Sequence, residues 1–264
     1  MTALTMAPAW ADTVAALEPI SLEELNTEAA LQTRVDRKYI VPVERWSEVF
    51  ASLGGDFRIL EQDGRRGFGY ESDYYDTPGL AAYYDAAHRR PRRYKVRTRH
   101  YLDSGLSAIE VKLRSARGET VKHREWLPTE SARATQLSFE SRTFVGSFAE
   151  IANEVGELSR VLTTSYERTT LVGGDARVTI DSGVSATGAD GRTTGFGDAL
   201  IVETKSASRA GSVDRALWAH GIRPVRVSKY CTSLAALQPE LPSNRWARTL
   251  RRHIADSPTS TVAY

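Results

Sequence analysis

Lysine and arginine recur at every second position in several segments of the chain. Between residues 94 and 100, Lys95, Arg97 and Arg99 alternate with uncharged residues. The same spacing groups charged residues in four further segments: Glu110, Lys112 and Arg114; Glu203 and Lys205; Arg34, Asp36 and Lys38; and Arg177 and Asp181, with the polar Thr179 between them on the same face. Because the side chains of a strand point alternately to opposite faces, each segment predicts a β-strand with one charged face.

Phosphate chemistry suits such faces. Same-face neighbours on a strand lie roughly 6.5–7 Å apart, so several cationic faces around a common space would repel one another unless an anion lay there. Arginine binds phosphate oxygens bidentately, lysine acts as a point charge, and the few acids would hold a divalent cation that bridges phosphate oxygens. The alternative is a solvent-facing sheet with cross-strand pairs of Glu and Lys.

Two-residue alternation dominates the rest of the chain and indicates a β-rich fold. The candidate strands are Arg34–Val41, Phe68–Tyr75, Arg92–Tyr101, Ser107–Arg114, Lys122–Leu127, Ser165–Leu171, Ala176–Asp181 and Ala199–Lys205. Closure of these strands into a barrel would turn the charged faces into a lumen and leave the apolar faces to pack against helices.

Helices are fewer. Apolar spacing predicts one helix from Trp46 to Leu53 and another along the stripe from Phe144 to Leu158. Ser212 and Ser228 have the residue type of N-caps, for helices that run to Gly221 and Leu237. We expect one domain over residues 18–242, between a flexible N-terminal arm, residues 1–17, and a flexible basic tail, residues 243–264.

The composition, with 264 residues, 41% apolar and 26% charged, is that of a globular protein with a substantial core. The net charge is only +2, yet seven Lys or Arg and no acid occur between His88 and Arg99, which indicates one locally basic surface. Cys231 is the single cysteine, so no intrachain disulfide can form and we expect a cytoplasmic protein. No apolar run approaches the roughly 20 residues that span a bilayer.

Eight short motifs together resemble the VTC domain, the catalytic domain of vacuolar transporter chaperone polyphosphate polymerases in the triphosphate tunnel metalloenzyme superfamily. The resemblance covers about residues 20–240, and a triplet such as Glu110-Val-Lys112 is weak until the others follow in order. The motifs begin at Arg34 (RVDRKYIV), Tyr74 (YYDTP), Tyr94 (YKVRTR), Glu110 (EVK), Tyr166 (YER), Arg177 (RVTID), Val202 (VETK) and Val227 (VSKY).

The resemblance implies an α+β fold, in which an eight-stranded antiparallel β-barrel forms a tunnel with flanking helices. It also implies that the protein is a polymerase, which transfers the γ-phosphate of ATP to a growing polyphosphate chain. By position it implies catalytic and substrate-binding roles for Lys38, Arg97, Arg99, Lys112, Arg168, Lys205 and Lys229, with Lys122 as a further contact. Glu203 would be the main ligand of Mn²⁺ or Mg²⁺, with Glu110 and Asp181 as further acidic ligands. Asp36 stands where the resemblance leads us to expect Glu, which leaves its role open, and the Tyr74 motif is expected to form a structural turn.

Two other functions stay open at this level. A hydrolase of tripolyphosphate or nucleoside triphosphates would differ only in that water attacks the phosphorus. The third possibility is a module that binds polyphosphate or nucleic acid without turnover. Nucleic acid is disfavoured because the acidic Glu110 and Glu203 are interleaved with the lysines and arginines. Whether the chain has a membrane-protein partner is also left open.

Overall fold

The structure is a computed structural model, and it describes residues 13–29, 35–54, 56–128, 136–173, 175–206 and 209–254. These residues divide into two compact units. The first unit contains the described residues up to Phe68 together with Tyr166–Val184 and Phe196–Val227. The second contains Gly69–Ser165, Ser185–Gly195 and the described residues from Ser228 onward.

The strands pair as an antiparallel sheet with flanking helices, as predicted. Within the described residues the main path joins eight strands in the order β2-β11-β9-β8-β4-β5-β6-β7, so β2 and β7 are the ends of an open path. The bounds are β2 Val35–Pro42, β4 Phe68–Asp76, β5 Arg93–Tyr101, β6 Leu106–Arg114, β7 Thr120–Leu127, β8 Ser159–Gly173, β9 Ala176–Gly188 and β11 Ala199–Ser206. Strands β8 and β9 contribute residues to both units.

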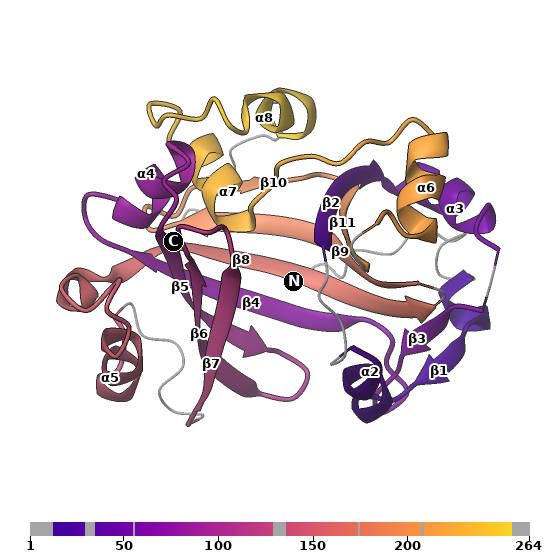
Figure 1. Cartoon of the computed structure of the whole chain (residues 1–264), viewed down its shortest axis with the longest axis horizontal. Helices are drawn as coiled ribbons and strands as arrows, with labels where there is room; N and C mark the ends of the chain where they lie inside the picture. The colour runs from indigo at the N-terminus through magenta and orange to yellow at the C-terminus, as the bar shows by residue number, and fades with distance from the viewer. Residues whose placement is uncertain are drawn as a thin grey trace. The chain divides into compact units, whose positions relative to one another are not determined.

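In the first unit, β2, β11 and β9 pack one face against two helices. Those helices are α3, Val43–Ala51, and α6, Ser212–Ala219, which lie next to each other (Figure 1). The core combines strand residues such as Tyr39 and Val202 with Trp46 of α3 and Leu217 of α6, all fully buried. The unit also holds β1 Glu18–Ile20, α2 Leu22–Ala29 and β3 Arg58–Leu60, and β1 pairs in parallel with β3.

In the second unit, β5, β6 and β7 form a three-stranded meander beside β4 (Figure 1). One face of the meander packs Val96 and Val111 against α5, Phe139–Gly146, and the turns that follow it. A second cluster joins α4 Ala81–Ala87, α7 Lys229–Leu237 and α8 Ala247–His253, and it includes the buried Cys231. The remaining elements are η2 Val155–Glu157 and β10 Thr193–Gly195, which pairs with β9.

The predicted strands all occur, and the long β8 and β9 extend beyond their predicted limits. Ser228 caps α7 as predicted, because its hydroxyl accepts a hydrogen bond from the Cys231 N–H. The helix predicted along Phe144 to Leu158 is wrong in its length: α5 ends at Gly146, and turns carry the rest of the stripe into the same core. Gly211, rather than Ser212, is the N-cap residue of α6.

The described parts of both predicted end segments are partly ordered into helix. Residues 13–16 are helical, and Val14 is buried in the core of the first unit. Helix α8 lies within the predicted tail, and Trp246 just before it is buried against α4 and α7. Residues 1–12 and 255–264 lie outside the described residues, and the predicted domain limits, residues 18–242, stay a prediction. No helix in the described ranges has the length and apolar character needed to cross a bilayer.

Candidate functional site

In the first unit, charged residues share the face of β2, β11 and β9 that is turned away from α3 and α6. The strand register places Glu203 of β11 opposite Lys38 of β2, and Lys205 of β11 opposite Arg177 of β9. Lys38 forms an ion pair with Glu203, and the Lys205 ammonium lies 3.9 Å from the other Glu203 carboxylate oxygen. We call this group, Lys38, Glu203 and Lys205, the Glu203 cluster.

The electrostatics of the Glu203 cluster follow from partial burial. Burial alone would raise the pKa of Glu203, but Lys38 and Lys205 outweigh it and hold that pKa well below its ordinary value. Burial lowers the pKa of Lys205 to about 8, even though Glu203 favours its charged form. The carboxylate is therefore ionised and Lys205 loses its proton only slightly above neutral pH.

Arg168 of β8 lies on the same charged face and is held rigidly. Its Nε and Nη2 donate to the two Asp181 carboxylate oxygens at 2.6 and 2.9 Å, a bidentate pair, and its guanidinium lies 5.3 Å from the centre of the Tyr166 ring. Asp181 is almost fully buried, with 1% of its side chain exposed, and the ion pair raises the pKa of Arg168 although burial alone would lower it. Asp181 thus orients a permanent cation.

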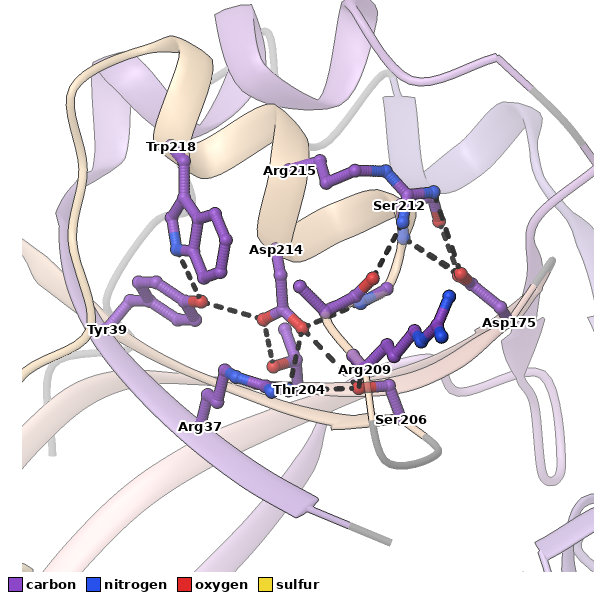
Figure 2. A network of polar contacts seen from close by, with 12 residues as sticks. Arg37, Tyr39, Asp175, Thr204, Ser206, Arg209, Ser212, Asp214, Arg215 and Trp218 are labelled. Atoms are coloured by element: carbon purple, nitrogen blue, oxygen red, sulfur yellow. Dashed lines mark hydrogen bonds and ion pairs between the residues drawn. The ribbon is translucent and has the colours of Figure 1, made fainter.

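A buried carboxylate on the other side of β2 and β11 anchors these strands to α6. Asp214 accepts hydrogen bonds from the Tyr39 hydroxyl at 2.7 Å and the Thr204 hydroxyl at 2.6 Å, and from Arg37 Nη1 at 3.2 Å (Figure 2). It also accepts from the Gly211 N–H at 2.9 Å at the start of α6. Because its strand partners alternate with Lys38, Glu203 and Lys205, this network fixes the strands whose opposite face carries the Glu203 cluster.

In the second unit, another acid, Glu110, is surrounded by cationic side chains. Glu110 of β6 has only 2% of its side chain exposed, and its Oε2 accepts from Arg97 Nε at 2.8 Å and Arg97 Nη2 at 2.6 Å. Its Oε1 accepts from Lys122 Nζ at 3.2 Å and lies 3.9 Å from Arg99 Nη1. Burial would raise the pKa of Glu110, but these cations hold it well below its ordinary value. We call Glu110, Arg97, Arg99 and Lys122 the Glu110 cluster.

Aromatic rings of β4 support both arginines of the Glu110 cluster. The Arg97 guanidinium lies 5.9 Å from the centre of the Tyr74 ring and donates to the Tyr74 hydroxyl at 3.1 Å. The Arg99 guanidinium lies 5.5 Å from the Tyr70 ring centre. These contacts hold the planar groups in place while part of each stays accessible.

Three lysines form a row across the meander next to the Glu110 cluster. The register places Lys95 of β5 directly opposite Lys112 of β6, which in turn lies opposite Lys122 of β7. Lys95 donates to the Ser228 hydroxyl at 2.7 Å, which brings it to the start of α7 where Lys229 is the first helical residue. Like charges directly opposite each other destabilise a sheet, so the row favours an anion over this face.

The acids fit a metal to different degrees. Within the described ranges there is no group of three or more His, Cys, Asp or Glu arranged to hold a metal ion. Both carboxylate oxygens of Asp181 and of Glu110 are engaged by arginine or lysine. Glu203 is more accessible, with 18% of its side chain exposed, and its ion-pair partners are lysines, whose long side chains act as point charges. One carboxylate is sufficient where substrate phosphates supply other ligands, so Glu203 fits such a metal.

The predicted residues thus fall into one set in each unit. Lys38, Arg168, Asp181, Glu203 and Lys205 belong to the first, and Arg97, Arg99, Glu110, Lys112, Lys122 and Lys229 to the second. Arg34 lies outside the described residues, and closure of the two sets into one tunnel stays a prediction. Arg177 and Lys95 also belong to these faces. They were absent from the predicted site, although the same alternation already placed them on charged faces.

The Tyr74 motif has the structural role expected of it. Asp76 ends β4 fully buried, and its carboxylate accepts from the backbone N–H groups of Thr77, Ala82 and Tyr83 and from the Tyr230 hydroxyl. The side chain therefore joins the start of α4 to α7 and takes no part in either charged cluster.

Comparison with known proteins places the chain in a family. The sequence model of the VTC domain matches residues 33–238, and the chain belongs to the VTC domain family, as its motifs indicated. No curated protein sequence matches the chain.

The solved structures that match this chain in a structural comparison have low sequence identity to it. HpAC1 from Hippeastrum, an adenylyl cyclase candidate described as having a dominant triphosphatase activity, is 12% identical, with a TM-score of 0.47 over 76% of this chain and 94% of that chain. The PH1819 protein from Pyrococcus horikoshii is 13% identical, with a TM-score of 0.43 over 78% of this chain and 97% of that one.

Proposed function

We propose that the chain is a metal-dependent polyphosphate polymerase that transfers the γ-phosphate of ATP to a growing polyphosphate chain. The observation that carries the proposal is the common face of β2, β11 and β9, where Lys38, Glu203 and Lys205 converge. Membership of the VTC domain family supports the same chemistry. A cytoplasmic setting, with ATP and inorganic polyphosphate as partners, belongs to this proposal.

The residues act by position and charge. Phosphoryl transfer breaks the bond from the γ-phosphorus to the oxygen that bridges it to ADP, and forms a bond to a terminal oxygen of polyphosphate. Lys38 and Lys205 are point charges that can turn from Glu203 to phosphate oxygens, whereas Arg168 is held by Asp181 and offers a fixed cation. The terminal phosphate is itself the nucleophile, so no protein nucleophile is required.

Glu203 would hold a divalent metal, Mn²⁺ or Mg²⁺, which would supply charge neutralisation at the phosphate groups. Glu110 and Asp181 are proposed to orient arginines, because both oxygens of each accept hydrogen bonds from arginine or lysine, whereas Lys205 lies 3.9 Å from its Glu203 oxygen. When Lys38 turns to a phosphate, it leaves a Glu203 oxygen open for this ligation.

The test compares the wild type with Glu203→Gln in the presence of ATP and Mn²⁺. Polyphosphate is followed on a stained gel and free phosphate in solution. Long chains made by the wild type support the polymerase, free phosphate alone supports a hydrolase, and neither product leaves a binding module. The variant should lose metal-dependent turnover, and wild-type rates in it would remove Glu203 from the mechanism. Glu48→Gln, an exposed acid on α3 in the same unit, is the matched control.

A further inference from the structure

Four arginines between residues 89 and 93 are not part of the Glu110 cluster. They are Arg89, Arg90, Arg92 and Arg93, and they follow α4 and begin β5. The Lys95, Arg97 and Arg99 positions of the same basic run belong to the charged face already described. The function proposed above leaves the first part of the run without a role.

Arg89 has a backbone conformation that favours glycine. Its φ is 59°, and it follows the last residues of α4, where its N–H donates to Ala86 O at 3.3 Å and the Arg90 N–H donates to Asp85 O at 2.9 Å. This is the helix ending in which glycine is the usual left-handed residue, because any side chain strains the backbone there. An arginine at this position keeps a cation on the surface at the expense of that strain.

An open cavity, closer to a surface depression than to an enclosed pocket, lies beside this turn. It has a volume of about 540 Å³ and is lined by Asp85, Arg90, Pro91, Arg92 and Ala116. Arg90 and Arg92 are exposed, and Asp85 is the single acid of the lining. Arg93 Nη1 donates to the Arg90 carbonyl at 2.6 Å and so braces the turn. We call this feature the arginine cavity.

Further arginines surround the turn from other elements. Arg93 of β5 lies directly opposite Arg114 of β6, a like-charge pair that destabilises the sheet. Arg245, which donates to the Ala86 carbonyl at 2.7 Å, is also close enough to act on Arg93. Burial lowers the pKa of Arg93, and Arg114 and Arg245 lower it further, although Asp85 acts in the opposite direction. Cations from several segments therefore converge around Asp85.

We propose that the arginine cavity is a second phosphate-chain site, which binds a segment of inorganic polyphosphate beyond the part held by the Glu110 cluster. This rests on the function proposed above. Arg93, which braces the turn beside the cavity without lining it, shares a face of β5 with Arg97 and lies two same-face steps from it, roughly 13 Å. Lys95, opposite Lys112, lies between them. The cavity therefore selects for chain length: a long polyphosphate reaches both sites, whereas a short triphosphate at Arg97 does not.

The test measures binding of long-chain polyphosphate and of tripolyphosphate to Arg90→Ala/Arg92→Ala. The double variant should lose about tenfold or more in affinity for the long chain, from two charge-assisted contacts, and keep wild-type affinity for tripolyphosphate. Arg192→Ala/Arg251→Ala removes the same charge from exposed positions of the same unit and should bind both ligands as the wild type does. Thermal unfolding checks that all three proteins are folded.

Three results would overturn the proposal. One is wild-type affinity of the double variant for the long chain, and another is an equal loss for both ligands, which would mean no selection for length. The third is loss of affinity for a single-stranded oligonucleotide with no loss for polyphosphate, which would make nucleic acid the ligand. If the wild type itself binds neither phosphate ligand, the function proposed above fails, whatever the variant does.

Discussion

The Glu203 cluster and the Glu110 cluster are both acids surrounded by cations, yet they differ in access and in the type of cation. Glu110 has 2% of its side chain exposed. Two nitrogens of Arg97 donate to one of its carboxylate oxygens, and Lys122 and Arg99 pair with the other oxygen. Glu203 is 18% exposed, and both of its partners are lysines.

This difference gives the two acids different expected roles: Glu110 positions its arginines, whereas Glu203 can exchange its lysine partners. Arginine offers a rigid fork, and a fully engaged carboxylate beneath it fixes the direction in which the remaining N–H groups point. Lysine is a flexible point charge that can leave a carboxylate for a phosphate. We infer that the Glu110 cluster is a preformed anion grip and that the Glu203 cluster is the part that rearranges when substrate and metal bind.

The largest expected effect is on stability, and it should separate the two acids. Glu110→Gln leaves several cations around a buried uncharged amide, so the free energy of unfolding should fall by about 3 kcal/mol. Glu203→Gln removes a more exposed pair, whose lysines can turn to solvent, and should cost less than Glu110→Gln. Urea unfolding of both variants measures the difference. Equal losses, or a larger loss for Glu203→Gln, would remove the distinction between the clusters.

The pH dependence of the wild-type free energy of unfolding tests the same comparison. The pKa values of Glu110 and Glu203 are both depressed when the chain is folded. Each ionised carboxylate therefore contributes stability above about pH 4.5, and this contribution is lost as the pH falls toward the pKa of the folded state. Glu110→Gln should therefore flatten the decline in unfolding free energy below that pH. An unchanged decline would show that Glu110 is not held by its cations.

The next effect is on ligand binding in the Glu110 cluster. Arg97→Ala should weaken tripolyphosphate binding by about 1.5–3 kcal/mol if its contact is charge-assisted. Arg97→Lys should not restore it, because the fork that is braced by Glu110 and Tyr74 is lost. Calorimetric titration measures both variants beside Arg192→Ala, an exposed arginine of the same unit. Full rescue by lysine would mean that a point charge suffices there.

The smallest effect is the pH dependence of binding at Lys205. Since burial lowers its pKa to about 8 from an ordinary 10.5, triphosphate affinity should fall as the pH rises through 8, by at most about tenfold per pH unit. Stability should move in the opposite direction, rising between about pH 8 and 10.5, because the unfolded chain binds the proton more tightly there. Lys205→Arg should abolish both trends. A decline in affinity that persists in this variant would belong to another group.

The charged faces could be predicted from the sequence because a strand forces its alternate side chains onto one side. The strands, the shared face of Lys38, Glu203 and Lys205, and the cap at Ser228 all follow from local spacing and residue type. The network around Asp214 could not be predicted in this way. It consists of polar residues on the core face of β2 and β11, which alternation treats as exceptions, and its acid comes from a helix distant in sequence (Figure 2).

The different surroundings of the three acids were also beyond the sequence, although the resemblance already implied Glu203 as the main metal ligand. Glu110, Asp181 and Glu203 have similar surroundings in their motifs, and each was predicted to ligate metal. Their burial and partners depend on tertiary packing, which leaves Glu203 accessible between lysines and engages both oxygens of the other two. Register explains Arg177 and Lys95, whose strands and faces were predicted although the matched motif positions did not include them.

The most direct test is a crystal structure of the chain with tripolyphosphate and Mn²⁺. We expect phosphate oxygens on the charged face of β2, β11 and β9, with Lys38 turned from Glu203 to a phosphate and Mn²⁺ on the Glu203 carboxylate. A triphosphate bound only to the Glu110 cluster or to another surface, with the pair of Lys38 and Glu203 intact, would contradict the account.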